Sequence, residues 1–340
     1  PLHPLAPDLA ASLPSTAGAG GIATQAPRPA PAAPAPLSAG CLMPPPLLTL
    51  RTRMAGHRGM IRAVDFTIDS QWIISGSEDR TVRLWGTTSR ESHGVVAELD
   101  DWVSTVRACP TGRLAAIGSN DKTVRLLDLE TREIVITKRC STPVGSVAWS
   151  PEGQWLAGGF LDGRIVCFDI EGNEVHRATI GHDSIRSLVA SPGGDRLAFG
   201  TASDPHIHLW DMVGWCDCGH IEGSGGNLRS LAWSADGAWI ATTSTDRSIR
   251  VWSVADACEV VRLEGHQGRV NTVAFHPFGP FLASGGADKS IRLWDVGSGR
   301  CVQTLSVHDG EVLALAWSQN GRLLASGSQD EQVGLFDAAS

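Results

Sequence analysis

The chain has 340 residues, of which 42% are hydrophobic and 19% are charged, so it is long enough to bury a large core. Its formal net charge of −8 argues against a sequence-independent binder of nucleic acid or anionic membranes, because such binding needs clustered lysine and arginine. No run of about 18 apolar residues is present, so no membrane-spanning helix is predicted. The eight cysteines are scattered, which is typical of reduced, buried thiols in an intracellular protein, cytoplasmic or nuclear.

Residues 1–46 differ in composition from the rest of the chain. Proline and alanine dominate this segment, and Asp8 and Arg28 are its only charged residues. Such a segment buries too little apolar surface to offset its loss of conformational entropy, so we predict a disordered, locally polyproline-like tail or linker. A targeting role is the alternative, although the segment lacks the layout of a signal peptide or a mitochondrial leader. The first residue, Pro1, is compatible with a fragment of a longer polypeptide.

From residue 47 onward the chain repeats with a period of 41 or 42 residues. The repeat is marked by one aspartate, which occurs at Asp79, Asp121, Asp162, Asp204, Asp246, Asp288 and Asp330. A large apolar residue follows six positions later, at Trp85, Leu127, Phe168, Trp210, Trp252, Trp294 and Phe336. The residues between the two markers alternate between polar and apolar, as in 290–294, and a period of two is typical of a strand.

A repeat of about 40–45 residues that carries four short strands is typical of one blade of a β-propeller. Residues 47–340 number 294, which is seven times 42, and no window of 12 residues among them has a helical period. We therefore predict an all-β fold over 47–340, a seven-bladed β-propeller with four antiparallel strands per blade. The phase of the repeat leaves the seventh blade one strand short, and residues 47–53 can supply that strand and so close the ring.

Two dipeptides at fixed places in the repeat resemble those of the WD40-repeat family, and the resemblance covers 47–340. They are Gly-His at Gly56-His57, Gly181-His182 and Gly265-His266, and Trp-Asp at Trp210-Asp211 and Trp294-Asp295. The resemblance implies a hydrogen-bonded Asp–His–Ser/Thr–Trp network inside each blade. The chemistry agrees, because a buried indole N–H needs an acceptor, and a hydroxyl can accept from it and from a histidine N–H. The other ring N–H can then donate to the carboxylate.

This predicted network is unevenly distributed among the blades. It is complete in blade 1 (His57, Ser75, Asp79, Trp85) and in blade 6 (His266, Ser284, Asp288, Trp294). It is partial in blade 7 (His308, Ser326, Asp330), blade 5 (Thr242, Asp246, Trp252) and blade 4 (His182, Asp204, Trp210), and blades 2 and 3 keep only Asp121 and Asp162. We interpret these residues as architectural, because a catalytic triad also needs an exposed nucleophile and an oxyanion site.

Motifs of enzymatic or cofactor chemistry are missing from the sequence. The G-x-S-x-G, H-E-x-x-H and G-x-x-x-x-G-K-[ST] patterns do not occur, so we expect no catalytic activity, cofactor or metal. Glycine-rich spots at 158–159, 223–226 and 285–286 are interpreted as turns rather than phosphate loops. Cys216, Cys218 and His220 would share one face of a strand, but this spacing falls short of a structural zinc site, and we interpret them as part of an outer strand.

The resemblance also implies a partner-binding face around the central channel. In the family, residues that point to this face flank the first hydrophobic residue of the innermost strand of each blade. Transferred position by position, the candidate partner-binding residues are Met60, Arg62, Trp102, Arg186, Arg229, Arg269 and Asn271. Blades 1 to 3 supply an apolar sector and blades 4 to 6 supply arginines, and tryptophan and arginine are the residue types that most often carry interface energy. The alternatives are a solvated loop charge for each arginine and core packing for Trp102.

From these residues we expect a non-catalytic scaffold or adaptor that binds a peptide or loop with acidic and apolar features, within a larger complex. Two other hypotheses stay open at this level. One is nucleic-acid binding through the arginines, although the negative net charge of the chain argues against it. The other is an enzyme that uses the channel, which would need carboxylates or a Ser/His pair without a role in the repeat.

Overall fold

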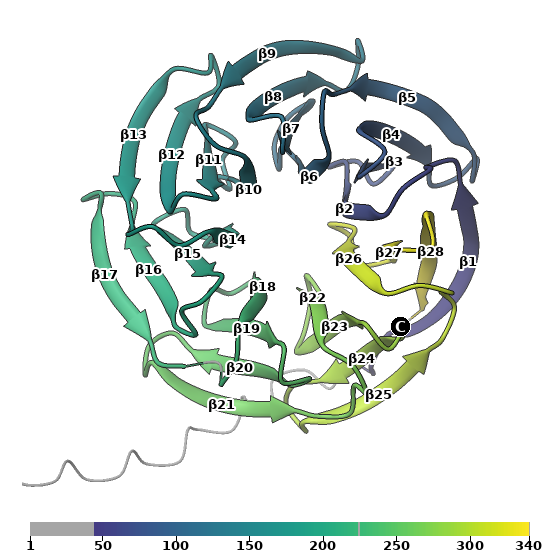
Figure 1. Cartoon of the computed structure of the whole chain (residues 1–340). Helices are drawn as coiled ribbons and strands as arrows, with labels where there is room; N and C mark the ends of the chain where they lie inside the picture. The colour runs from purple at the N-terminus through teal and green to yellow at the C-terminus, as the bar shows by residue number, and fades with distance from the viewer. Residues whose placement is uncertain (1–43, 224, 340) are drawn as a thin grey trace, which may run out of the picture. The chain divides into compact units, whose positions relative to one another are not determined.

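The computed structural model describes residues 44–223 and 225–339. The tail or linker expected over 1–46 therefore lies outside the described residues, except for 44–46. The described part forms seven four-stranded antiparallel sheets, which are arranged as blades around a central axis (Figure 1). This confirms the predicted all-β, seven-bladed propeller. Within the described ranges there is no helix that could cross a membrane.

Each blade has the same order of strands from the channel outward. The innermost strands are β2 (Ile61–Phe66), β6 (Val103–Ala108), β10 (Val144–Trp149), β14 (Ile185–Ala190), β18 (Leu228–Trp233), β22 (Val270–Phe275) and β26 (Val312–Trp317). The second strands are β3 (Trp72–Ser77), β7 (Leu114–Ser119), β11 (Trp155–Phe160), β15 (Arg196–Thr201), β19 (Trp239–Ser244), β23 (Phe281–Gly286) and β27 (Leu323–Ser328). The third strands are β4 (Thr81–Gly86), β8 (Thr123–Asp128), β12 (Arg164–Asp169), β16 (Ile207–Asp211), β20 (Ile249–Ser253), β24 (Ile291–Asp295) and β28 (Gln332–Ala339). The outermost strands are β5 (Ser92–Glu98), β9 (Glu133–Arg139), β13 (Glu174–Thr179), β17 (Cys216–Ile221), β21 (Cys258–Leu263), β25 (Arg300–Leu305) and β1 (Leu47–Ala55).

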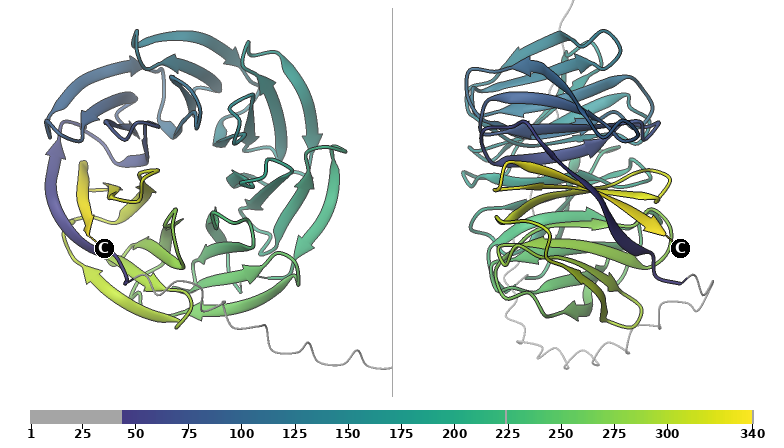
Figure 2. Two further views of the ribbon diagram at one scale, coloured as in Figure 1. Left: turned by 180° about the vertical axis from the view of Figure 1, so that it is seen from behind. Right: turned by 90° about the vertical axis from the view of Figure 1, so that its right-hand side faces the viewer.

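The seventh blade takes its outermost strand from the other end of the described chain, as the phase of the repeat predicts. Strand β1 pairs antiparallel with β28, from Leu47 opposite Ala339 to Ala55 opposite Gln332 (Figures 1 and 2). The side chain of Gln303 on β25 bonds to both backbone polar groups of Leu48, each at 2.8 Å. Backbone pairing and these side-chain bonds together remove the open edge that an unpaired β28 would expose.

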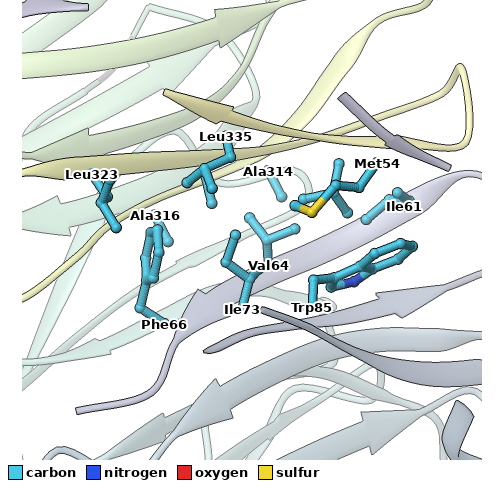
Figure 3. Packing of buried hydrophobic residues seen from close by; sticks show 12 residues of the cluster. Met54, Ile61, Val64, Phe66, Ile73, Trp85, Ala314, Ala316, Leu323 and Leu335 are labelled. Carbon is cyan, nitrogen blue, oxygen red and sulfur yellow. The ribbon is translucent and has the colours of Figure 1, made fainter. Parts of the chain in front are cut away.

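Apolar side chains fill the spaces between neighbouring blades. Between the seventh and first blades, Met54, Val64 and Trp85 lie in one buried cluster with Ala314 and Leu335 (Figure 3). Six further clusters occupy the remaining described spaces around the ring and beneath the outer strands. Because burial of one large apolar side chain contributes about 1.5–3 kcal/mol, this packing is the main source of stability and holds the channel at a fixed width.

Glycine on the second strand permits the close approach of the next blade. It occurs there in six blades, at Gly76, Gly118, Gly159, Gly200, Gly285 and Gly327. A Cβ atom at Gly159 would lie 2.5 Å from Ile185, and one at Gly285 would lie 2.4 Å from Val312, so no side chain fits without movement. The prediction of turns at 158–159 and 285–286 is therefore wrong, because both pairs lie inside strands β11 and β23.

The seven repeat aspartates lie in the turns between the second and third strands. In each turn the carboxylate accepts a hydrogen bond from the backbone N–H two residues later, at 2.9–3.4 Å. In six of these turns the residue directly after the aspartate has a positive φ, as in Arg80 (68°) and Lys122 (67°). The carboxylate thus holds a tight turn by a purely local bond, which explains why it recurs even in blades 2 and 3.

Blades 1, 6 and 7 contain the internal network that the sequence suggests. In blade 1, His57 Nδ1 lies 2.8 Å from Asp79, His57 Nε2 lies 2.7 Å from Ser75 Oγ, and Trp85 Nε1 donates to the same oxygen at 2.8 Å. Blade 6 repeats these contacts with His266, Ser284, Asp288 and Trp294 at 2.8 Å each. Blade 7 has the two histidine contacts, from His308 to Asp330 at 2.8 Å and to Ser326 at 2.7 Å, and Phe336 stands in place of the tryptophan.

The protonation of these histidines refines the expected direction of the bonds. Burial lowers the pKa of His266 and of His308, so at neutral pH each ring carries one N–H. That N–H donates from Nδ1 to the aspartate, and Nε2 must then accept. The hydroxyl of Ser284 therefore donates a hydrogen bond to the histidine ring and accepts one from the indole N–H of Trp294. This differs from the prediction that the hydroxyl accepts both bonds.

The other blades replace the histidine contacts. In blade 5, Trp252 Nε1 donates to Thr242 at 2.9 Å, while Asp246 pairs with Arg250 at 2.6 Å. Ser224, which occupies the histidine position in the sequence of this blade, lies outside the described residues. In blades 2 and 3 the aspartates pair instead with an arginine of the following strand. Asp121 contacts Arg125 at 2.9 Å, and Asp162 contacts Arg164 at 2.6 Å.

Blade 4 departs from the expected network at His182. This residue is exposed, and Asp204 instead accepts bonds from His206 (2.5 Å) and His208 (2.9 Å). The cause is one extra residue in the turn, since Asp204 follows strand β15 by three positions, whereas Asp79 follows β3 by two. The position after the aspartate is Pro205, whose ring excludes the positive φ used in the other turns. The indole N–H of Trp210 is buried without a hydrogen-bond partner, because Phe199 occupies the place of the serine.

Candidate partner-binding face

A cavity of about 340 Å³ opens at the end of the channel where the innermost strands begin, and all seven blades contribute to its lining. Five of the seven candidate residues line it, namely Arg62, Trp102, Arg186, Arg229 and Asn271. Their positions follow from the architecture, because the innermost strand of each blade presents its first residues to the mouth of the channel. We call the residues that line this cavity the channel mouth.

One side of the channel mouth is basic. Arg62 is paired with Glu78, whose carboxylate lies 2.7 Å from Nε. Among the described residues, neither Arg186, which is exposed, nor Arg229 has a carboxylate partner. Arg229 donates a hydrogen bond to the side-chain oxygen of Asn271 at 3.4 Å. Burial, together with the charges of Arg269 and Arg186, lowers the pKa of Arg229. The charged state of this guanidinium is therefore disfavoured by its surroundings, and an incoming anion would relieve that penalty.

The opposite side of the channel mouth is apolar. Trp102 is 45% exposed and Leu161 is 37% exposed, and both line the cavity. Core packing, the alternative considered for Trp102, does not occur, since the ring is open to solvent. Asp100 and Asp101 are exposed beside it, and the backbone N–H of Trp102 donates to the carboxylate of Asp101 at 2.7 Å. The apolar side thus has two exposed acidic residues beside it in the chain.

Met60 and Arg269, the two remaining candidates, do not line the cavity. Met60 is partly buried, and its carbonyl accepts the backbone N–H of Glu78 at 2.9 Å. Arg269 pairs with Glu311 at 2.8 Å, so its charge is compensated within the protein. Both belong to the rim of the face at most.

A second cavity of about 120 Å³ lies deeper in the channel and contains an arginine that the sequence analysis missed. Arg107 lines it together with Arg62, Arg186 and Arg229, and the remaining lining side chains are mostly serine, threonine and small apolar residues. Strict alternation from Val103 would place Arg107 on the core side. Every innermost strand, however, has a register shift between its first and third residues, which in β6 lies between Val103 and Thr105. This bulge changes the direction of the residues that follow.

The two cysteines and the histidine of the outer strand β17 do not assemble a metal site. Cys216 and Cys218 are exposed, whereas His220 contacts the rings of His206 and His208 at 4.6 and 6.3 Å between centroids. Among the described residues, no group of three or more His, Cys, Asp or Glu side chains is placed to hold a metal ion. The seven described cysteines are free thiols, of which two are buried, two are partly buried and three are exposed. The expectation of buried thiols is therefore wrong for the three exposed ones and holds in full only for Cys109 and Cys167.

Comparison with family models agrees with this architecture. The model described as WD domain, G-beta repeat matches residues 48–86, 174–211, 216–253, 257–295 and 299–337, which is more than half of the chain. The chain belongs to the WD40-repeat family. A second model, described as the WD40 domain of anaphase-promoting complex subunit 4, matches residues 106–191. The WD40 repeat matches leave out 87–173, which contains blade 2 and the three inner strands of blade 3, the two blades whose internal network is reduced to its aspartate.

The chain is similar to WD40 proteins with diverse names. It is 31% identical to the small ribosomal subunit protein RACK1 of Caenorhabditis elegans over 241 residues, covering 54% of this chain and 73% of that protein. It is 27% identical to the nuclear distribution protein PAC1 of Coccidioides posadasii over 196 residues, covering 48% of this chain and 41% of that protein. It is 29% identical to the transcription initiation factor TFIID subunit 5 of C. elegans over 198 residues, covering 57% of this chain and 30% of that protein. The chain thus spans less than half the length of the last two.

Proposed function

We propose that this WD40 protein is a non-catalytic scaffold or adaptor inside the cell, and that its channel mouth binds a peptide or loop of a partner protein. The observation that carries the proposal is the asymmetry of one cavity, in which Arg186 and Arg229 lack carboxylate partners and face the exposed Trp102 and Leu161. A peptide with an acidic group and an apolar side chain would satisfy both sides at once.

Two further observations support a role in an assembly. Two of the similar proteins are named as a ribosomal subunit protein and as a subunit of a transcription initiation factor. The free thiols among the described cysteines suit a reducing compartment, the cytoplasm or the nucleus. We therefore infer that the natural partners are proteins of a larger complex.

The test is a comparison of partner capture by matched variants. Partners of the full chain are first identified by cross-linking mass spectrometry in cells. Trp102→Ala and Arg229→Glu should each weaken at least one such partner by more than about 1 kcal/mol, roughly a fivefold rise in Kd. Phe278→Ala is the matched aromatic control, because Phe278 is 52% exposed on a loop between the first and second strands of blade 6, at the other end of the channel.

The charge control is Arg177→Glu on the outer strand β13, where Arg177 pairs with Glu174 at 2.6 Å. Both control variants should bind every partner as the parent does. Retention of all cross-linked partners by Trp102→Ala and Arg229→Glu would show that the partners dock elsewhere.

A further inference from the structure

Among the described residues, the two cavities along the channel are lined by four arginines and by no carboxylate. Arg62, Arg186 and Arg229 line both cavities, and Arg107 lines the deeper one. Hydroxyl groups complete the deeper cavity, with Ser146 and Ser187 among them. Guanidinium and hydroxyl groups are all hydrogen-bond donors, so the channel offers donors on several sides to whatever enters from the mouth.

Among the described residues, only one of the four arginines, Arg62, forms an ion pair within the protein. Arg62 is bound to Glu78. Arg107 has no ion pair among the described residues, although its charge favours the ionised form of the buried Asp65, whose pKa is raised by burial. Among the described residues, neither Arg186 nor Arg229 has an ion pair. The carboxylate of Glu311, whose charge favours the ionised form of Arg229, is held by Arg269 at 2.8 Å and by the side-chain amide of Asn271 at 3.2 Å. Arg186 and Arg229, which both line the channel mouth, therefore carry positive charges that no ion pair among the described residues balances.

We propose that the channel mouth binds a phosphate monoester, with Arg186 and Arg229 as the principal ligands of the phosphoryl oxygens. A phosphate monoester carries a charge of about −1.5 to −2 at pH 7 and three acceptor oxygens, which matches two uncompensated guanidinium groups. A single carboxylate supplies one charge and would leave one arginine without a partner. The planar fork of each guanidinium suits bidentate contact with phosphate.

Asn271 orients the central arginine for this contact. Its side-chain oxygen lies 3.4 Å from Arg229 and 3.3 Å from Arg269, while its amide nitrogen donates to the backbone carbonyl of Val312 at 3.1 Å. The amide is buried and its four contacts fix its plane, so Arg229 is held against the cavity before any ligand arrives. This inference rests on the proposed function, in which the phosphoryl group belongs to a side chain of the docking peptide.

The first experiment separates phosphate from carboxylate. The side-chain Nε–H signals of arginine are followed by NMR while the full chain is titrated with O-phosphoserine or with aspartate. O-phosphoserine should shift the signals of Arg186 and Arg229 and bind at least about fivefold more tightly than aspartate at pH 7.5. Its affinity should fall several-fold at pH 5.5, because the second phosphate pKa is about 6, whereas the affinity for aspartate should stay constant. Equal affinity for both probes, or no pH dependence, would overturn the proposal.

The second experiment uses substitutions that leave the fold unchanged. Arg186→Gln and Arg229→Gln should each weaken O-phosphoserine binding by about tenfold or more, since each removes a charge-assisted contact. Arg177→Gln on β13 is the matched control and should bind as the parent does. Melting temperatures are recorded for each variant, and a loss of binding counts only with an unchanged or raised melting temperature. Parent-like affinity of the double variant Arg186→Gln/Arg229→Gln would overturn the assignment.

A third arm identifies the source of the phosphate. A pool of random peptides with a central phosphoserine is compared with O-phosphoserine and with glycerol 2-phosphate. Tighter binding of the pool, reduced by Trp102→Ala, supports a phosphorylated peptide. Equal binding of all three probes supports a free phosphate ester.

The outcomes also separate this inference from the proposed function. If Trp102→Ala releases protein partners but no phosphate probe binds, the inference fails and the scaffold function stands. If phosphate binds through Arg186 and Arg229 while all partners dock elsewhere, the scaffold assignment of this face fails and the anion site stands.

Discussion

Removal of one serine hydroxyl in blade 1 should be far more destabilising than a surface change of the same size. Ser75 Oγ is fully buried and serves two groups at once, the indole N–H of Trp85 at 2.8 Å and the ring of His57 at 2.7 Å. In Ser75→Ala both groups lose their partner where water cannot replace it. Each unsatisfied buried polar group costs about 1–3 kcal/mol, so the loss of two should lower the free energy of unfolding by about 2–6 kcal/mol.

Blade 7 provides a natural comparison that isolates the tryptophan contact. Ser326 bonds His308 at 2.7 Å, but Phe336 replaces the tryptophan, so Ser326→Ala leaves one group unsatisfied and should cost about 1–3 kcal/mol. Urea unfolding of both variants, with the exposed Ser92→Ala as control, measures the difference. A cost of Ser326→Ala equal to or above that of Ser75→Ala would refute the assignment of two bonds to Ser75. So would a cost of Ser75→Ala below about 0.5 kcal/mol, the range of ordinary surface changes.

Three further outcomes follow from the closure, the buried ionisable groups and the channel. Burial lowers the pKa of His266 and His308, so the stability that these neutral rings contribute is complete above about pH 6.5 and falls as the pH drops below it. Burial raises the pKa of Asp288, but its hydrogen bonds lower that pKa by more, so the folded state favours the ionised carboxylate. Protonation of this carboxylate should therefore cause a second loss of stability below about pH 4. Urea midpoints from pH 8 to 3 should show both steps, and His308→Gln should flatten the first. Deletion of 47–54 removes the pairing partner of β28 and should lower the melting temperature by several degrees, and an unchanged melting temperature would contradict closure by β1. Arg229→Gln should keep or raise the melting temperature by up to a few degrees in a thermal scan, because it removes a charge that the folded state disfavours.

The fold could be predicted from the sequence because the residues that mark the repeat interact within their own turn or strand. Each aspartate forms a bond with the backbone two residues later in its own turn, so its recurrence requires no long-range information. The alternation that precedes each third-strand aromatic residue is likewise a property of one strand. Seven copies of a local pattern were enough to give the blade count, the order of strands and the closure by β1.

Features that depend on a neighbour or on a single irregularity could not be read in the same way. Gly159 and Gly285 look like turn residues, yet their lack of a side chain is required by Ile185 and Val312 of the adjacent blade. The position of Arg107 depends on the bulge in β6, which leaves no distinct mark in the sequence. His182 precedes Asp204 by the same number of residues as His57 precedes Asp79, which made it the candidate. The extra residue in the turn after β15 means that this spacing no longer places the histidine beside the aspartate.

Two buried arginines show how structural and functional charges differ in this ring. Arg250 is 5% exposed and is held by Asp246 at 2.6 Å and by Glu259 at 3.2 Å, so its charge is matched inside its own blade. Arg229 is only partly buried and bonds to Asn271 rather than to a carboxylate. Burial and the charges of neighbouring arginines lower its pKa, although the charge of Glu311 opposes this. A charge with such surroundings weakens the folded state, since a desolvated cation without a counterion is unfavourable. A ligand that supplies the missing negative charge best explains why this arginine is present at the channel mouth. Arg229→Gln should then raise the stability of the protein and abolish binding of that ligand, as expected where a binding residue is kept at a cost in stability.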